Sequence, residues 1–130
     1  MIIRIFLAAI AVMFFAFGFW SLTDPIGMTE RLDVTVSGPN AAFEMRGIFG
    51  GVSLGAGLMS AVGAVFPVRF ERPALYVLLV YMGGYTIARL FSLLIGDDAT
   101  LNGWLFASFE VLTFILTAAA LRIRSGHQAK

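Results

Sequence analysis

The sequence predicts an all-α membrane protein in which four transmembrane helices form an up-down-up-down antiparallel bundle. The chain of 130 residues is 59% hydrophobic and 13% charged, whereas about 25% of the residues of soluble domains are charged. It contains four apolar stretches of about 20 residues or more, the length that crosses a bilayer. These stretches and their connections account for the whole chain, so we expect residues 1–130 to form a single membrane domain.

The first span is expected at residues 5–23, because the sequence from Ile5 to Thr23 carries no charge. Trp20 lies near its end, where an indole suits the headgroup level of the bilayer. A cleaved signal peptide is the alternative, since Arg4 precedes the apolar stretch. Against it, the apolar core is longer than usual in signal peptides and no small-residue cleavage site follows.

Residues 24–42 are expected to form an extramembrane loop. They are rich in turn-forming residues, which are Pro25, Gly27, Gly38, Pro39 and Asn40. Within the loop, Leu32, Val34 and Val36 alternate with polar residues. This alternation leaves open a short strand or hairpin arm.

Three further spans are expected, at residues 43–66, 73–95 and 101–121. The second span ends before Pro67 and a basic cluster. Pro73 suits the first turn of the third span, which ends at Gly96 and two aspartates. The fourth span ends at Arg122, and residues 122–130 form a polar tail.

The distribution of basic residues predicts the orientation. The N-terminus, the second loop and the C-terminus contain Arg4, Arg69, Arg72, Arg122, Arg124 and Lys130, whereas the first and third loops contain only Arg31. The positive-inside rule then places both termini in the cytoplasm and the acidic first and third loops outside. We therefore expect a multi-pass protein of the cell inner membrane, with the lipid bilayer as its first partner. The net charge of +1, with dispersed arginines, argues against a nucleic-acid partner.

Arg46, Arg89 and Glu110 are charged residues inside the predicted spans. Such charges are costly at membrane depth, so they mark a function or an obligatory pairing. At about 1.5 Å rise per residue, all three lie roughly 5–12 Å inside the outer ends of their helices. We predict that Glu110 pairs with Arg89, Arg46 or both. Glu44, one turn or less from the span boundary, is near enough to balance the second arginine, and without it the cluster keeps a positive excess.

Residues at helical spacing extend this layer into a polar cluster. Tyr81 and Tyr85 share a helix face with Arg89, and Thr113 shares one with Glu110. The candidate ligand-binding or ion-pair cluster is therefore Glu44, Arg46, Tyr81, Tyr85, Arg89, Glu110 and Thr113. Because buried ion pairs also fix helix register, a purely structural lock stands as an equal alternative to a ligand or ion site.

The second span is rich in glycine. Gly47, Gly51 and Gly55 form a GxxxGxxxG ladder, and Gly50 and Gly57 lie on a neighbouring stripe. Small residues let helix backbones approach closely in a membrane. We expect this helix to be central and packed on two sides, with structural glycines.

No cofactor, metal site or catalytic residue is predicted. The chain has no cysteine, and its single histidine, His127, lies in the polar tail, so haem, copper and zinc sites are not expected. Glu110 is the one candidate acid–base group, but a neighbouring arginine holds a carboxylate ionised and makes it a poor proton exchanger. We expect a non-enzymatic role.

The motif Glu-Met-Arg-Gly-Ile-Phe-Gly-Gly at residues 44–51, with Arg89 late in the third span and Glu110 in the fourth, carries a family resemblance. The chain resembles, over nearly its whole length, the bacterial family of small four-helix membrane proteins catalogued as domain of unknown function 4345. The resemblance implies a four-span bundle and assigns no activity.

Three functions are open. The first is a binding or accessory bundle whose outward cavity, lidded by the first loop, receives an anionic or amphipathic small molecule such as a lipid headgroup or quinone. Two arginines against one deep carboxylate favour an anion. The second is a structural subunit or assembly factor that docks another membrane protein or a second copy of itself. The third is a small transporter or proton path through Glu110, which is disfavoured because the sequence shows no broken spans or internal repeat.

Overall fold

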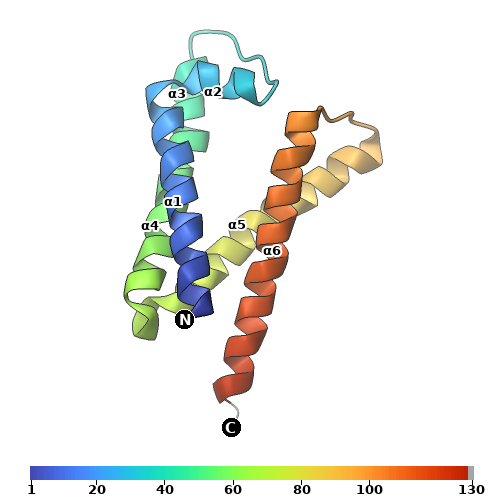
Figure 1. Cartoon of the computed structure of the whole chain (residues 1–130). Coiled ribbons are helices and arrows are strands. Elements are labelled where there is room, and N and C mark those ends of the chain that lie inside the picture. The colour runs from blue at the N-terminus through green and yellow to red at the C-terminus, as the bar shows by residue number, and fades with distance from the viewer. Residues whose placement is uncertain (129–130) are drawn as a thin grey trace.

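The structure, a computed structural model, describes residues 1–128 and the side chains of residues 1–124. All regular elements of that part are helices, and it contains no strand (Figure 1). The elements are α1 (Ile2–Thr23), α2 (Pro25–Arg31), α3 (Ala41–Met45), the π-helical turn η1 (Arg46–Gly51), α4 (Val52–Val65), α5 (Pro67–Ile95) and α6 (Leu101–Gln128). Residues 129–130 of the predicted tail and the side chain of His127 lie outside the described part.

Within the described residues, four helices are long and apolar enough to cross a membrane, and they are Ile2–Thr23, Ala41–Val65, Pro67–Ile95 and Leu101–Arg124. The third begins at Pro67, so the prediction of a start at Pro73 is wrong. Proline suits the first helical position because its missing N–H is not needed there, and Pro67 takes that place while Pro73 lies inside the helix. With 29 residues, α5 is about 44 Å long and exceeds the roughly 30 Å of hydrocarbon in a bilayer.

The first loop is more ordered than its turn-forming composition suggests. Asp24 caps α2 by accepting a hydrogen bond from the Gly27 N–H at 3.0 Å, and Pro25 takes the first position of that helix. The residues that alternate in the sequence follow α2 as an irregular segment, so the strand left open above does not form. A lone segment here has no neighbouring strand to satisfy its backbone groups.

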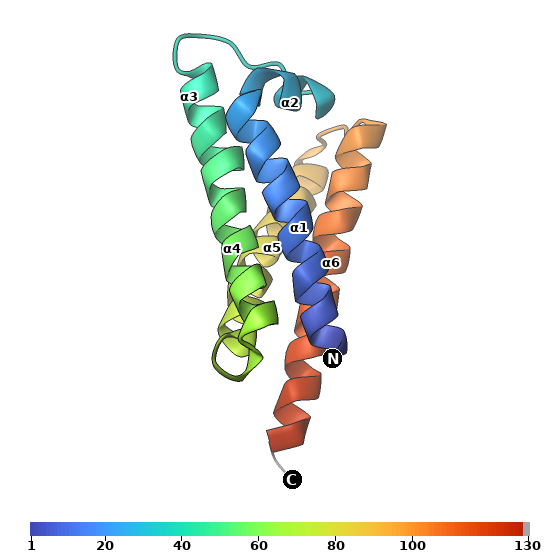
Figure 2. The same cartoon turned by 60° about the vertical axis from the view of Figure 1, so that its left-hand side comes forward.

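Consecutive long helices are neighbours in space. α1 packs along α4, α4 along α5, and α5 along α6, whereas α1 and α6 share no extended contact within the described residues. Figures 1 and 2 show both chain ends at one end of the bundle and α2 at the other. We call these the terminal end and the α2 end. In Figure 1, α6 diverges from α1 towards the α2 end.

The packed core lies mainly towards the terminal end. Leu7 and Ile10 of α1 meet Leu75 and Leu78 of α5 there, all of them nearly inaccessible to solvent. Gly63 of α4 enables the close approach of α4 and α5, since a Cβ at this position would lie 2.5 Å from the Ala74 Cβ. The sequence did not single out this glycine. Because the helices are closest here and spread at the other end, space remains for a cavity near α2.

The glycine-rich helix packs through only one of its two predicted stripes. A Cβ on Gly50 would lie 2.7 Å from a methyl group of Leu22, and a Cβ on Gly57 would lie 3.1 Å from the Phe15 ring. The ladder of Gly47, Gly51 and Gly55 instead faces open space, with no atom closer than 3.9 Å to a Cβ built there. The predicted packing of this helix on two sides is present, since α4 lies along both α1 and α5. The ladder takes no part in it, because it occupies a face adjacent to the buried stripe.

Candidate functional site

Arg89 of α5 and Glu110 of α6 form a bidentate ion pair. The Arg89 Nε donates to Glu110 Oε2 at 2.9 Å, and the Nη2 donates to Oε1 at 3.0 Å. The Glu110 side chain is 9% exposed and that of Arg89 is 45% exposed. Paired N–H···O bonds between a guanidinium and a carboxylate combine charge with fixed geometry and rank among the strong side-chain interactions. The predicted pairing of Glu110 with Arg89 is therefore present.

Arg46 and Glu44 do not join this pair, so the predicted layer of several charges is wrong. Arg46 is exposed, and its Nε donates to the Leu22 carbonyl oxygen at 2.9 Å. Leu22 lies in the last turn of α1, where carbonyl groups have no partner within the helix, and the arginine supplies one. Glu44 is exposed and forms no ion pair with any side chain of residues 1–124.

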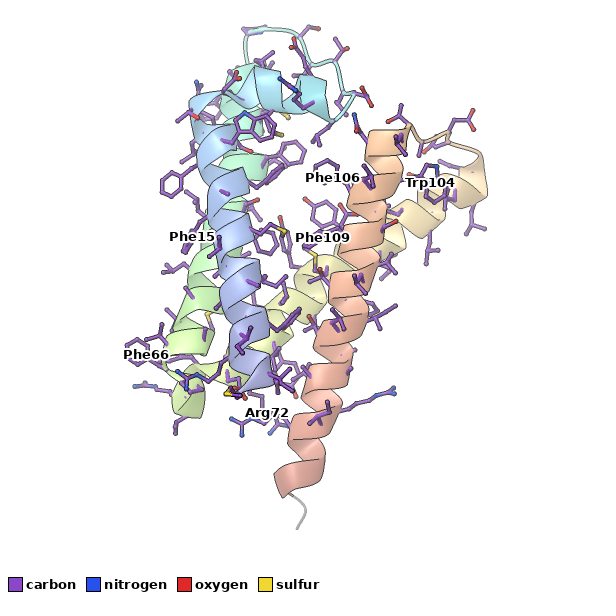
Figure 3. All side chains as sticks on the ribbon, in the orientation of Figure 1. Phe15, Phe66, Arg72, Trp104, Phe106 and Phe109 are labelled. Atoms are coloured by element: carbon purple, nitrogen blue, oxygen red, sulfur yellow. The ribbon has the colours of Figure 1, made fainter. Side chains whose placement is uncertain are left out.

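A cavity of about 490 Å³ lies beside the ion pair. α1, the first loop, η1, α4, α5 and α6 all contribute to its wall, and Arg89 and Glu110 are the charged residues in it. Its aromatic wall is formed by Phe14, Phe17, Phe49, Phe106, Phe109 and the two tyrosines. In Figure 3, Phe106 and Phe109 lie on the side of α6 that faces α1, whereas Trp104 lies on the opposite side.

Tyr81 and Tyr85 line the cavity in line with Arg89. Their hydroxyl oxygens are 3.5 Å apart, and their rings meet edge to face with centroids 5.2 Å apart. The Arg89 guanidinium lies 5.9 Å from the centroid of the Tyr85 ring. Ser53 of α4 lines the same cavity. A polar strip therefore runs through the aromatic wall from Ser53 to Arg89.

Thr113 does not belong to the cavity, and its predicted place in the cluster is wrong. It is 2% exposed and lies outside the cavity wall, on the terminal side of Glu110. Its carbonyl oxygen accepts a hydrogen bond from the Thr117 hydroxyl at 2.7 Å. Because α6 approaches the other helices in this direction, the face that carries Glu110 continues into packed core.

The first loop closes the α2 end of the cavity. Asp33 Oδ2 accepts hydrogen bonds from the Thr100 hydroxyl at 2.7 Å and from the Asn102 amide at 3.1 Å, which ties the loop to the start of α6. Leu32 and Val34, on either side of Asp33, form part of the cavity wall. We call residues 31–34 the strap. Asp33 has a φ of 59°, a left-handed conformation that aspartate tolerates better than most residues.

A second ion pair joins α5 and α6 at the terminal end. The Arg124 Nε lies 2.6 Å from Glu71 Oε1, and the Glu71 side chain is 8% exposed. This pair was not predicted, because a third span that begins at Pro73 leaves Glu71 in a loop. One signal was present, since Glu71 and Arg89 are 18 positions apart (89 − 71), which is about five turns and therefore the same helix face.

Chemically, the cavity offers hydrogen-bond donors, hydroxyl groups and aromatic faces around a mutually neutralised pair. In the described part of the chain, no three His, Cys, Asp or Glu side chains are grouped to hold a metal ion. The part of the cavity that the sequence did not predict is its wall of phenylalanine side chains. The chain contains 13 phenylalanines, and helical spacing alone does not separate those that line a cavity from those that face lipid.

The chain matches no curated protein and no solved structure. A family model described as Domain of unknown function (DUF4345) matches residues 2–121. This match confirms the resemblance noted in the sequence, and the chain belongs to the DUF4345 family.

Proposed function

We propose that this is a non-enzymatic membrane protein that binds a small amphipathic molecule in the cavity beside Arg89 and Glu110. The observation that carries the proposal is a largely aromatic cavity of about 490 Å³ with one charged pair in its wall. Ligand pockets typically have volumes of about 300–1,000 Å³, apolar walls and a few well-placed polar groups. An amphipathic molecule presents the complementary surface, with a polar head for the strip and an apolar body for the rings.

We further propose an up-down-up-down insertion into the cell inner membrane, with both termini cytoplasmic. Basic residues gather near the terminal end, where Arg4 donates to the Ala64 carbonyl oxygen and Arg124 pairs with Glu71. The α2 end carries the acidic loops. The positive-inside rule favours the α2 end outside, which puts the cavity in the outer half of the bilayer.

Native mass spectrometry of the detergent-purified protein tests the binding function. We expect a retained non-covalent adduct in the wild-type protein that Phe106→Ala reduces, because Phe106 lines the cavity. Phe91→Ala is the matched control, since Phe91 is 61% exposed on α5 and outside the cavity wall. A wild-type protein that carries no adduct and retains none after incubation with membrane lipid extract contradicts the proposal.

Helix docking is a second candidate function, favoured by the exposed glycine ladder. Gly47, Gly51 and Gly55 leave an open face on which a helix of another membrane protein, or of a second copy, can approach closely. Gly51→Leu would block that approach without touching the interior. Crosslinking in native membranes should give a specific adduct that this variant loses, and a wild-type protein that crosslinks to nothing removes the docking role.

A further inference from the structure

We propose that the cavity selects neutral amphiphiles whose head carries hydrogen-bond-accepting oxygens, and that it discriminates against anionic ones. This inference rests on the proposed binding function and specifies its ligand class. It reverses the anion preference that the sequence suggested, because that preference assumed two arginines at one carboxylate.

The two charges of the cavity wall neutralise each other. Arg89 and Glu110 are the charged residues of the cavity wall, and each oxygen of the carboxylate faces a nitrogen of the guanidinium at 2.9–3.0 Å. Arg46, which would have supplied a positive excess, is bound to the end of α1 instead. An anionic head beside Arg89 would therefore also lie close to the Glu110 carboxylate, in surroundings that screen charge poorly. A neutral head meets no such repulsion.

Arg89 has N–H groups that Glu110 does not engage. Glu110 engages the Nε and one Nη of Arg89, and no other described group accepts from the guanidinium. The Arg89 side chain is 45% exposed and lines the cavity. Arginine has only donors, so its remaining N–H groups require an acceptor such as a carbonyl oxygen. A carbonyl-bearing head satisfies them without bringing a charge.

The side chains around the cavity also limit the shape of the molecule that fits. Leu32 and Val34 of the strap cover the α2 end, while α1 and α6 share no extended contact although both contribute to the wall. To reach the surrounding bilayer, an apolar tail longer than the cavity must pass between side chains of α1 and α6. The rings of Phe17 and Phe106 pack against each other in this wall, with centroids 6.2 Å apart, and offer apolar aromatic faces to a flat head.

Three probes with the same ten-carbon tail test how carbonyl acceptors and a negative charge in the head affect binding. Decylubiquinone carries neutral carbonyl acceptors, decylbenzene carries none, and decyl phosphate is anionic. Binding is measured by titration calorimetry of the full-length protein in a non-ionic detergent. We expect decylubiquinone to bind about 10- to 100-fold more tightly than decylbenzene, the factor for a hydrogen bond to a charged group. Decyl phosphate should bind at least about tenfold more weakly than decylubiquinone.

Glu110→Gln sharpens the test, because it keeps the shape of the side chain and leaves the Arg89 charge uncompensated. The affinity for decyl phosphate relative to decylubiquinone should rise about tenfold or more. Glu71→Gln is the matched control, since it removes the carboxylate of the other α5–α6 ion pair, outside the cavity. It should leave the order of affinities unchanged.

Each outcome has a definite meaning. A wild-type protein that prefers decyl phosphate, or that binds decylbenzene as tightly as decylubiquinone, overturns the inference and leaves the binding function standing. A wild-type protein that binds none of the probes contradicts the binding function itself. The wild-type order decides the question even if Glu110→Gln does not fold.

Discussion

Replacing Gly63 with alanine should destabilise the contact between α4 and α5. The new Cβ would lie 2.5 Å from the Ala74 Cβ and 3.2 Å from the Phe70 carbonyl oxygen. Both neighbouring atoms are fixed to the backbone of α5, so neither can rotate away. Carbon atoms in contact prefer about 3.5–4.0 Å. The two helices must therefore separate by about 1 Å at the point where the core is tightest.

Such overpacking costs about 1–3 kcal/mol of the free energy of unfolding. Alanine also favours the helix over glycine by about 1 kcal/mol, which offsets part of the loss. Gly55→Ala isolates the packing contribution, because Gly55 lies in the same helix and no atom would lie within 4 Å of its Cβ. The helix preference cancels in the comparison, so Gly63→Ala should be less stable than Gly55→Ala by about 1–3 kcal/mol.

Unfolding in mixed micelles, followed by circular dichroism against the mole fraction of denaturing detergent, gives the two free energies. The midpoint for Gly63→Ala should lie at a lower denaturant fraction than that for Gly55→Ala. Equal midpoints would refute the reasoning, since they would mean that α4 and α5 do not approach at Gly63 as closely as described.

Three further predictions concern the polar contacts. Glu71→Ala should lower the free energy of unfolding by about 1–3 kcal/mol, because Arg124 loses its ion-pair partner at a buried position. The exposed substitution Glu44→Ala, measured in the same way, should change the free energy of unfolding by less than about 0.5 kcal/mol. Arg46→Met removes the hydrogen bond to Leu22 and should lower the unfolding free energy by about 0.5–1.5 kcal/mol, while decylubiquinone affinity stays at the wild-type value; a loss of binding would return Arg46 to the site. Asp33→Ala removes the acceptor for Thr100 and Asn102 and should speed amide hydrogen exchange in the strap, with exposed Asp97→Ala as the control; unchanged exchange would show that these bonds do not hold the strap.

The sequence predicted the long helices and the Arg89–Glu110 pair because both depend on quantities that a sequence displays. Span length and the lack of charge mark a helix that can cross a bilayer. Two opposite charges at similar depth on consecutive spans have few other partners in an apolar environment. Both inferences therefore needed only the positions of apolar and charged residues along the chain.

The errors share a different physical origin. Arg46 binds a backbone carbonyl group, which every residue has and no pattern reveals, and its position depends on where α1 ends. Pro67 and Pro73 are both compatible with a helix start, and the choice between them decides whether Glu71 lies in a loop or in a helix. Whether the ladder or the neighbouring stripe of Gly50 and Gly57 is buried depends on the rotation of the helix about its axis. Because both stripes consist of small residues, the sequence is compatible with either rotation.

The strap and the cavity wall join segments that are synthesised at different times. Asp33 contacts Thr100 and Asn102, and the cavity wall combines α1 with α6, so the first and the last of the described helices are both required. A nascent chain that has not yet delivered α6 holds Arg89 without its carboxylate and has only part of the wall. On the proposed binding function, a ligand meets the complete cavity wall only after α6 has packed against α5.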